Sequence, residues 1–288
     1  MTRHVVIMAG GVGSRLYPLS TPEHPKQFID LLGCDKTLIR LTYERFLAVG
    51  DDLRFWVVTS GAYTHFVHEQ LPEIPDEQIL AEPVARNTAP CIAYACWKIK
   101  EKYPDANIVI TPADAYVPDV KAFAATMYTA LDFTASRNAI VCIGISPDSP
   151  HTGYGYIHAP AEVGKVVKVA AFKEKPSAEV ARCYLDEGGY WWNAGIFVWN
   201  VGTIERELRA HAPQICGVMD KLAPSLYGEG EEAALAELFP QSDKISIDYA
   251  VMEKSADVYA LAADWAWSDL GSFEAIEKIT GRDPRKNL

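Results

Sequence analysis

The sequence predicts an α/β fold with a mixed, mostly parallel central sheet flanked by helices. Three observations support this prediction. Short apolar segments rich in β-branched residues recur along the first half of the chain, helical stretches separate them, and 49% of the 288 residues are hydrophobic, which is enough for a sizeable core. Strands that alternate with helices in this way form right-handed crossovers, which lay the strands side by side in parallel.

The expected elements of the first half follow one another at short intervals. The first strand is apolar and runs directly into a glycine-rich loop, as buried strands before tight turns do. Asn87 is a good N-cap, and Pro90 falls in the first turn of the helix that Asn87 opens. We expect strands at residues 4–9, 54–59, 78–81 and 107–111, and helices at residues 37–48, from about residue 62, and from residue 87 onward.

From about residue 152 the pattern changes to short alternating stretches that predict partly antiparallel strands. We expect strands at residues 153–157, 165–172 and 190–199, and short helices near residues 201–210 and 230–238. The sequence has no internal repeat and no Gly/Ser linker between its halves. We therefore expect one domain over residues 1–288.

Charge and composition exclude several classes of function. The formal net charge is −11, from 27 basic and 38 acidic residues, which argues against binding to nucleic acid or to an anionic membrane surface. No apolar run has the length of about 18 residues that a membrane helix needs, and no signal-peptide core precedes the first strand, so we expect a cytoplasmic protein. The six cysteines lie in apolar segments without a C-x-x-C pair, and we expect buried free thiols at Cys34, Cys91, Cys96, Cys142, Cys183 and Cys216.

Polar groups follow three of the expected strands at their carboxyl ends. A glycine loop follows the first strand, residues 82–87 follow the third, and Asp114 follows the fourth. Ligands of open α/β sheets bind at this edge. The sequence therefore predicts a site there.

The glycine loop, residues 9–19, is the strongest local motif. Its glycines let backbone N–H groups crowd a phosphate chain, and Arg15 and Lys26 supply positive charge to it. The loop is not a dinucleotide fingerprint, because Leu16 stands at the third glycine position, and it is not an ATPase P-loop, because Gly13 is followed by Ser14 and Arg15.

This loop and seven further motifs resemble the sugar-1-phosphate nucleotidylyltransferases, in particular the mannose-1-phosphate guanylyltransferase branch. The motifs span residues 5 to 273, in the family's order. They are residues 9–19 with Pro25-Lys26-Gln27-Phe28, then residues 82–90, 112–114, 153–157, 172–176, 192–197, 247–254 and 267–271.

The resemblance implies a Rossmann-like nucleotide-diphospho-sugar transferase fold and a reaction. A phosphate oxygen of mannose 1-phosphate attacks the α-phosphorus of GTP in line, which gives GDP-mannose and pyrophosphate. The metal implied is Mg²⁺, with Mn²⁺ as the alternative because oxygen ligands suit both. The resemblance also divides the domain into a nucleotide-binding half at about residues 1–150 and a sugar-phosphate-binding half at about residues 151–288.

The family's functional residues match positions throughout this chain. Asp114 and Asp269 match the metal ligands, and Arg15 and Lys26 match residues that bind the triphosphate; these four are the expected catalytic residues. The expected nucleotide-binding positions are Arg15, Lys26 and Asp114 together with Ala9, Gly10, Gly11, Gly13, Ser14, Glu82 and Asn87, with Glu82 an attractive acceptor for guanine. The expected sugar-phosphate positions are Gly155, Glu174, Lys175, Asn193 and Asp248.

Two departures from the branch keep alternatives open. Ala115 stands where the branch commonly has histidine, and the chain ends at Leu288, where many relatives continue, so we expect no isomerase activity. Another sugar 1-phosphate, such as a heptose, or another nucleotide, such as dTTP or UTP, remains an alternative. A catalytically silent nucleotide-sugar sensor is a further one, although both metal carboxylates are retained. A homodimer is compatible with each alternative.

Overall fold

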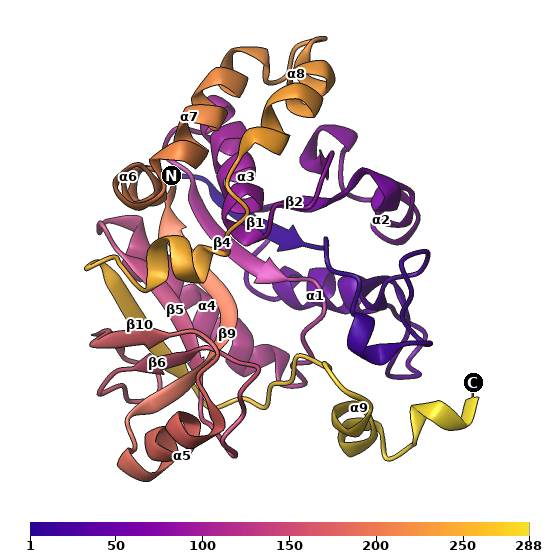
Figure 1. Ribbon diagram of the computed structural model, residues 1–288, viewed down its shortest axis with the longest axis vertical. Helices are drawn as coiled ribbons and strands as arrows, with labels where there is room; N and C mark the ends of the chain where they lie inside the picture. The colour runs from indigo at the N-terminus through magenta and orange to yellow at the C-terminus, as the bar shows by residue number, and fades with distance from the viewer. Residues whose placement is uncertain (288) are drawn as a thin grey trace.

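The computed structural model describes residues 1–287, and within them ten strands form one sheet (Figure 1). The main order of the strands is β3-β2-β1-β4-β9-β5-β10-β7, with β6 and β8 attached beside β9. The strands are β1 (Arg3–Met8), β2 (Leu53–Ser60), β3 (Ile79–Glu82), β4 (Asn107–Pro112), β5 (Ile140–Ile145), β6 (Tyr156–His158), β7 (Val166–Lys168), β8 (Ala171–Lys173), β9 (Tyr190–Asn200) and β10 (Val258–Ala263).

The sheet is mixed, as expected. Strands β1 to β4 pair in parallel, and so do β5 and β10. The long strand β9 lies antiparallel between β4 and β5, and it joins the parallel group of β1 to β4 to the parallel pair β5 and β10. Strand β6 pairs antiparallel with both β8 and β9, which brings a short ribbon beside the main sheet.

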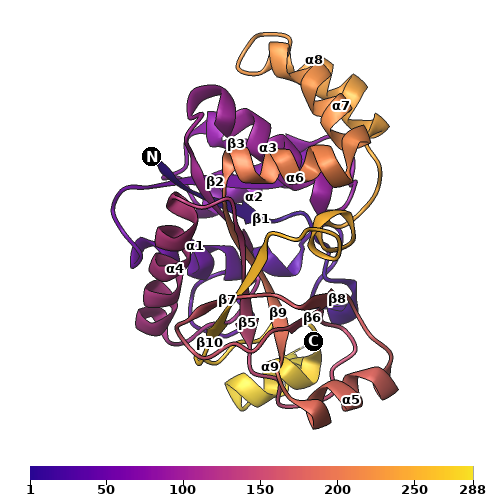
Figure 2. The ribbon, with the colours of Figure 1, turned by 90° about the vertical axis from the view of Figure 1, so that its left-hand side faces the viewer.

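Helices cover both faces of the sheet (Figure 2). Side chains of β1 alternate between the faces: Val5 and Ile7 pack with one apolar cluster and Val6 with the other. The first cluster includes residues of α1 (Leu38–Leu47), α2 (Thr64–Gln70) and α4 (Val120–Ala135), and the second includes residues of α3 (Thr88–Lys102), α6 (Val201–His211), α7 (Pro213–Leu222) and α8 (Glu231–Leu238). Two further helices, α5 (Ala178–Glu187) and α9 (Phe273–Thr280), lie at the periphery.

Two strand predictions in the second half are wrong in extent. The stretch 165–172 is two strands, because β7 pairs with β10 whereas β8 pairs with β6, so the chain turns between them. Of residues 153–157, only Tyr156 and Ile157 are in a strand, while residues 153–155 form a loop. That loop lines the cavity described below.

The prediction for the cysteines is correct for four thiols and wrong for two. Cys91, Cys96, Cys142 and Cys216 are buried and free. Cys34 and Cys183 are exposed, because Cys34 lies in the loop before α1 and Cys183 lies on α5, which buries little of its surface. In residues 1–287, no helix combines the length and the apolar character that crossing a membrane requires.

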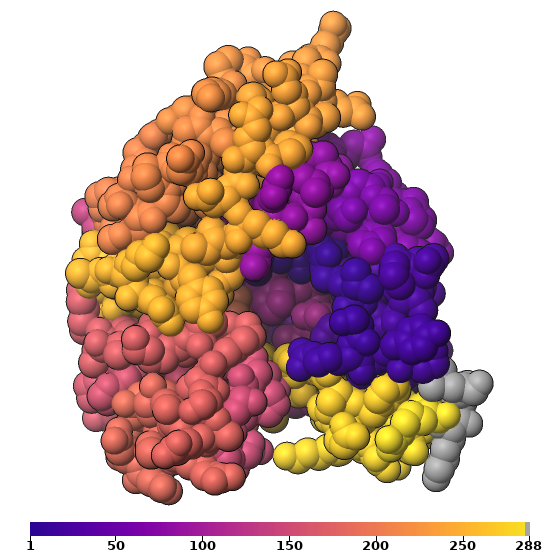
Figure 3. All heavy atoms as spheres, viewed as in Figure 1, coloured from indigo at the N-terminus to yellow at the C-terminus, as the bar shows by residue number. Residues whose placement is uncertain are grey.

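The carboxyl ends of β1, β3 and β4 meet at one edge of the sheet, as the topology requires. Loops of the second half close over this edge from the other side. A hollow opens between the N-terminal segment, shown in indigo, and the second half of the chain (Figure 3).

Candidate functional site

A cavity of about 210 Å³ lies in this hollow, between the two halves of the chain. Its walls come from the ends of β1 and β4, the start of α3, the loop 153–155, β9 and the segments around residues 248 and 269. Six of the residues expected from the sequence line it: Asp114, Gly155, Glu174, Asn193, Asp248 and Asp269.

The two aspartates expected to hold a metal lie in neighbouring loops. Asp114 follows β4, and Asp269 lies in the segment between β10 and α9. A backbone bridge joins the two segments: the N–H of Tyr116 donates to the carbonyl of Ser268 at 2.8 Å, and the N–H of Ser268 donates back at 3.1 Å. This bridge brings together two carboxylates that are far apart in sequence.

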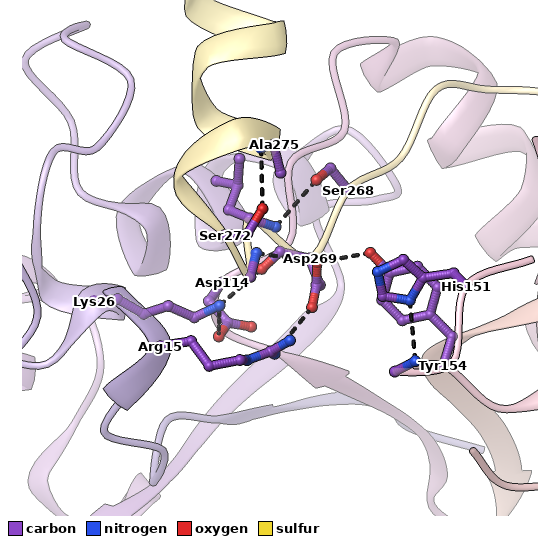
Figure 4. Close-up of polar contacts among 12 residues, drawn as sticks. Arg15, Lys26, Asp114, His151, Tyr154, Ser268, Asp269, Ser272 and Ala275 are labelled. Atoms are coloured by element: carbon purple, nitrogen blue, oxygen red, sulfur yellow. Dashed lines mark hydrogen bonds and ion pairs between the residues drawn. The ribbon is translucent and has the colours of Figure 1, made fainter. Parts of the chain in front are cut away.

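Two cations from the N-terminal segment face these aspartates (Figure 4). Lys26 Nζ lies 2.9 Å from Asp114 Oδ2 and donates to the backbone carbonyl of Asp269 at 2.7 Å. The Arg15 guanidinium is largely exposed, and its Nη2 lies 3.4 Å from Asp269 Oδ2. Each carboxylate therefore has a cation beside it, and Lys26 contacts both loops.

The aspartate pair has the chemistry of a divalent-cation site. Magnesium is commonly held by one or two carboxylates, with phosphate and water oxygens as the other ligands. Among residues 1–287 no group of three or more His, Cys, Asp or Glu side chains has a metal-binding arrangement. The donor set thus fits a hard cation that shares its coordination with a phosphate, and it does not fit a closed structural metal site.

Gln27 holds the backbone of the glycine loop through two hydrogen bonds. Its Nε2 donates to the carbonyls of Ala9 and Gly11, at 2.9 and 2.8 Å. Gly13 has φ 67°, and a Cβ there would lie 2.9 Å from Lys26 Cγ, so only glycine suits this position. Gly10, Gly11 and Ser14 nevertheless remain exposed, as a loop that binds phosphates requires.

The residues expected near the base differ in their surroundings. Glu82, at the end of β3, is buried, and burial raises its pKa to about 7. Its Oε1 has no hydrogen-bond partner within the described chain. Asn87 is exposed and caps α3, as expected, with its side-chain oxygen accepting from the N–H of Thr88 at 2.8 Å.

The expected sugar-phosphate residues form a connected set on the opposite wall. Asn193 donates through Nδ2 to Asp248 Oδ1 at 3.1 Å and through its N–H to the Gly155 carbonyl at 2.8 Å. A Cβ at Gly155 would lie 2.6 Å from Glu174 Oε2, so a side chain there would displace that carboxylate. Lys175 forms an ion pair with Glu174 and lies at the exposed rim.

The charges of this wall influence one another. Burial, and then the charge of Glu174, raise the pKa of Asp248 to about 6. Burial opposes the charged form of Lys175, but the Glu174 carboxylate outweighs it and raises the pKa of Lys175 above its usual value. At neutral pH the wall therefore presents acceptor oxygens inside and a cation at the rim.

Backbone in the left-handed region recurs around the site. Asn87, Lys175 and Leu270, which follows Asp269, have φ values of 69°, 46° and 47°. Non-glycine residues adopt this region only where their surroundings impose it, and such residues are enriched at functional sites.

Tyr154 is a site residue that the sequence analysis did not single out. Its hydroxyl donates to Asp269 Oδ1 at 2.8 Å, and its ring stacks on His151 with centroids 3.8 Å apart. Trp192 and Trp267 contact the ring edge-to-face. Burial and the Asp269 carboxylate raise the pKa of the hydroxyl, which keeps it a donor. Asp269 thus lies between Arg15 on one side and Tyr154 on the other (Figure 4).

Comparison with known proteins gives the family. A family model described as nucleotidyl transferase matches residues 4–285. The chain belongs to the nucleotidyl transferase family. Members of this family generally use a divalent metal ion, in agreement with the donor set of the aspartate pair.

Individual relatives of this nucleotidyl transferase come from several bacteria. A mannose-1-phosphate guanylyltransferase of Escherichia coli K12 is 36% identical over 98% of this chain, and one of Sinorhizobium fredii is 37% identical over 94%. The chain spans 61% and 54% of the length of these two relatives. A crystal structure from Thermus thermophilus, described as a mannose-1-phosphate geranyltransferase, superimposes on this chain with a TM-score of 0.87 at 31% sequence identity. The match covers 99% of this chain and 81% of the Thermus chain.

The contact between Tyr154 and Asp269 predicts a role in metal binding. We expect Tyr154→Phe to weaken Mn²⁺ binding about tenfold, because Asp269 loses a hydrogen bond that orients its carboxylate while the packed ring stays in place. Titration of Mn²⁺ followed by electron paramagnetic resonance measures this. Tyr128→Phe, at an exposed position on α4, is the matched control. Equal affinities of wild type and Tyr154→Phe would show that the hydroxyl does not orient Asp269.

Proposed function

We propose that this nucleotidyl transferase transfers GMP from GTP to mannose 1-phosphate and releases GDP-mannose and pyrophosphate. The observation that carries the proposal is a single cavity. On one wall two carboxylates face two cations, and on the other Asn193 is hydrogen-bonded to Asp248 and to Gly155. The names of the two bacterial relatives support the choice of base and sugar. In this proposal the first half of the chain binds the nucleotide and the second half binds the sugar phosphate.

The glycine loop, Arg15 and Lys26 would bind the triphosphate. Attack at the α-phosphorus needs no protein nucleophile, so catalysis consists of positioning the reactants and neutralising charge. The exposed amides of the loop supply donors, and the two cations lie beside the carboxylates where the reacting phosphates would meet.

Asp114 and Asp269 would hold the metal, for which we propose Mg²⁺. When bound, this ion would neutralise the phosphate oxygens and lower the repulsion between the two anionic substrates. The chain's own part is to hold both carboxylates at a fixed separation, which the Tyr116–Ser268 bridge does, and to keep Lys26 between them.

The opposite wall would bind mannose 1-phosphate. Lys175 would pair with its phosphate, while Glu174, Asn193 and Asp248 would accept from and donate to the sugar hydroxyls. The missing side chain of Gly155 leaves room for the ring beside Glu174. Buried polar groups reject a wrong epimer because it leaves them unpaired.

Guanine would be bound near the glycine loop by Glu82, with Asn87 nearby. Guanine offers two neighbouring N–H donors, and Glu82 has a buried carboxylate oxygen without a partner in residues 1–287. Its ionised form is the one that accepts both hydrogen bonds.

Ala115 favours one second candidate, the same reaction with a larger sugar 1-phosphate such as a heptose. Its small side chain lines the cavity directly after Asp114, where the related branch commonly has histidine. A smaller wall residue leaves space that a larger substrate could fill.

A substrate panel tests the proposal. We expect pyrophosphate release with Mg²⁺ to be strongest for GTP with mannose 1-phosphate when GTP, ATP, UTP and dTTP are each combined with mannose, glucose, fucose and heptose 1-phosphates. Asp269→Asn should cut turnover by about a hundredfold or more, because one metal carboxylate is lost. If another nucleotide and sugar 1-phosphate give the strongest signal, that pair replaces GTP and mannose 1-phosphate as the proposed substrates. Silence of a folded, GTP-binding protein across the panel would identify a sensor instead.

Lys175→Ala tests the assignment of the sugar-phosphate wall. We expect the apparent KM for mannose 1-phosphate to rise about tenfold or more while that for GTP changes little, because the cation lies on the sugar wall only. Steady-state kinetics with each substrate varied in turn separates the two constants. Lys173→Ala, an exposed lysine two residues earlier, should leave both unchanged. Equal rises in both constants for Lys175→Ala would contradict the assignment.

Glu82 predicts a pH dependence of GTP binding. Its pKa of about 7 means that the carboxylate gains a proton as the pH falls through neutrality, so the KM for GTP should rise below pH 7. Glu82→Gln should bind GTP more weakly at pH 8 and lack this dependence. Both proteins are measured from pH 6 to 8.5. The titration of GTP itself affects both profiles equally, so the difference between them reports the titration of Glu82. Parallel profiles of the two proteins would contradict the role of Glu82.

A further inference from the structure

We propose that Thr42 and Arg45 of α1 are positioning residues that fix the backbone on both sides of Asp114 and so set its carboxylate for metal binding. The inference rests on the proposed function, because it concerns the same metal site. Neither residue lies in a motif that the sequence analysis used, and neither contacts the cavity that holds Asp114 and Asp269.

The two side chains bind the two carbonyls that flank Asp114. Thr42 Oγ1 donates to the carbonyl of Ala113 at 3.1 Å, and Arg45 Nη1 donates to the carbonyl of Ala115 at 3.0 Å. Arg45 Nη2 also donates to Thr42 Oγ1 at 3.0 Å, so the three hydrogen bonds form one continuous chain. A spacing of three residues places both side chains on the same face of α1.

Both side chains are buried and held in place. Thr42 is fully buried and Arg45 is 4% exposed. The guanidinium of Arg45 lies over the ring of Phe123 of α4, at 5.0 Å from its centroid. A side chain that packing restricts in this way can fix the backbone to which it donates.

The burial of Arg45 is not explained by an ion pair. No carboxylate of residues 1–287 lies within ion-pair distance of its guanidinium, although burying an unpaired charge is costly. Burial lowers the pKa of Arg45 only to about 10, so it stays charged at neutral pH. A charged donor strengthens its hydrogen bonds, and the backbone around Asp114 receives them.

The hydrogen bonds of Thr42 and Arg45 also affect Asp269, through the backbone. Tyr116 follows Ala115 directly and forms the bridge with Ser268, the residue before Asp269. A shift of residues 113–115 would therefore change the separation of the two carboxylates. The Asp114 side chain itself is about a quarter exposed to the cavity, so α1 fixes its backbone and leaves its oxygens free for a ligand.

Thr134 offers a matched control for the experiment. It is also fully buried and donates through Oγ1 to Asn107 Oδ1 at 2.9 Å, but at the other end of β4. Thr134→Val and Thr42→Val each remove one buried hydroxyl, and only the second change touches the Asp114 end of the strand.

The test measures Mn²⁺ binding directly, by electron paramagnetic resonance, together with the thermal unfolding midpoint. We expect Thr42→Val to bind Mn²⁺ about tenfold more weakly and Thr42→Ser, which keeps the hydroxyl, to bind like wild type. Thr134→Val should lose similar stability and keep the wild-type affinity. Arg45→Lys keeps the charge but replaces the two donor nitrogens of the guanidinium by one, so it should also weaken binding. It tests the proposal if Thr42→Val does not fold.

Two outcomes would overturn the proposal, and they can be told apart. If Asp114→Asn reduces Mn²⁺ binding but Thr42→Val and Arg45→Lys bind like Thr134→Val, the positioning role is wrong and the metal site stands. If Asp114→Asn binds Mn²⁺ like wild type, Asp114 is not a metal ligand, and the metal site of the proposed function fails together with this inference.

Discussion

The contact of Lys26 with two loops is the interaction on which the arrangement of the site depends. Asp114 and Asp269 carry like charges and belong to segments that only the fold brings together. Lys26 Nζ reaches the carboxylate of the first and the backbone of the second, from a position that is almost fully buried. Gly13 has no side chain and lets the lysine pass beside the loop. One cation therefore joins the glycine loop, the end of β4 and the segment after β10.

Strand β9 provides the matching constraint for the second half. It runs antiparallel between β4 and β5, so its early residues lie near the carboxyl ends of its parallel neighbours. Asn193 comes to the cavity in this way and hydrogen-bonds to both Gly155 and Asp248. In a sheet of only parallel strands, the carboxyl ends of all strands lie at one edge, so the first residues of a strand would never reach that edge.

Strand order alone predicted that the glycine loop, Glu82 and Asp114 lie at one edge of the sheet. Parallel strands end at one edge, so the glycine loop, Glu82 and Asp114 had to lie close together. The residues of the opposite wall could be named only from the resemblance, because β6, β7 and β8 have three residues each and are too short for a periodic pattern. The partners of Gln27, Thr42, Arg45 and Tyr154 are distant in sequence, and no local pattern marks a side chain that will bind a distant carbonyl or carboxylate. Helix α4, in contrast, carries a clear sequence signal, because its N-cap is Asp119, a residue type that is favoured there.

Burial divides the carboxylates of the cavity region into two kinds with different chemistry. Asp114 and Asp269 are about a quarter exposed and lie beside cations. Glu82 and Asp248 are largely buried, and burial is the first cause of their raised pKa values. Partly exposed carboxylates have oxygens free to bind a metal that also contacts a phosphate, whereas buried ones are better suited to neutral hydrogen-bonding groups such as a base or a hydroxyl. In the function proposed above, the same side-chain type would therefore hold the ion at the centre of the site and recognise the base and the sugar at its two ends, because the fold gives each carboxylate a different exposure.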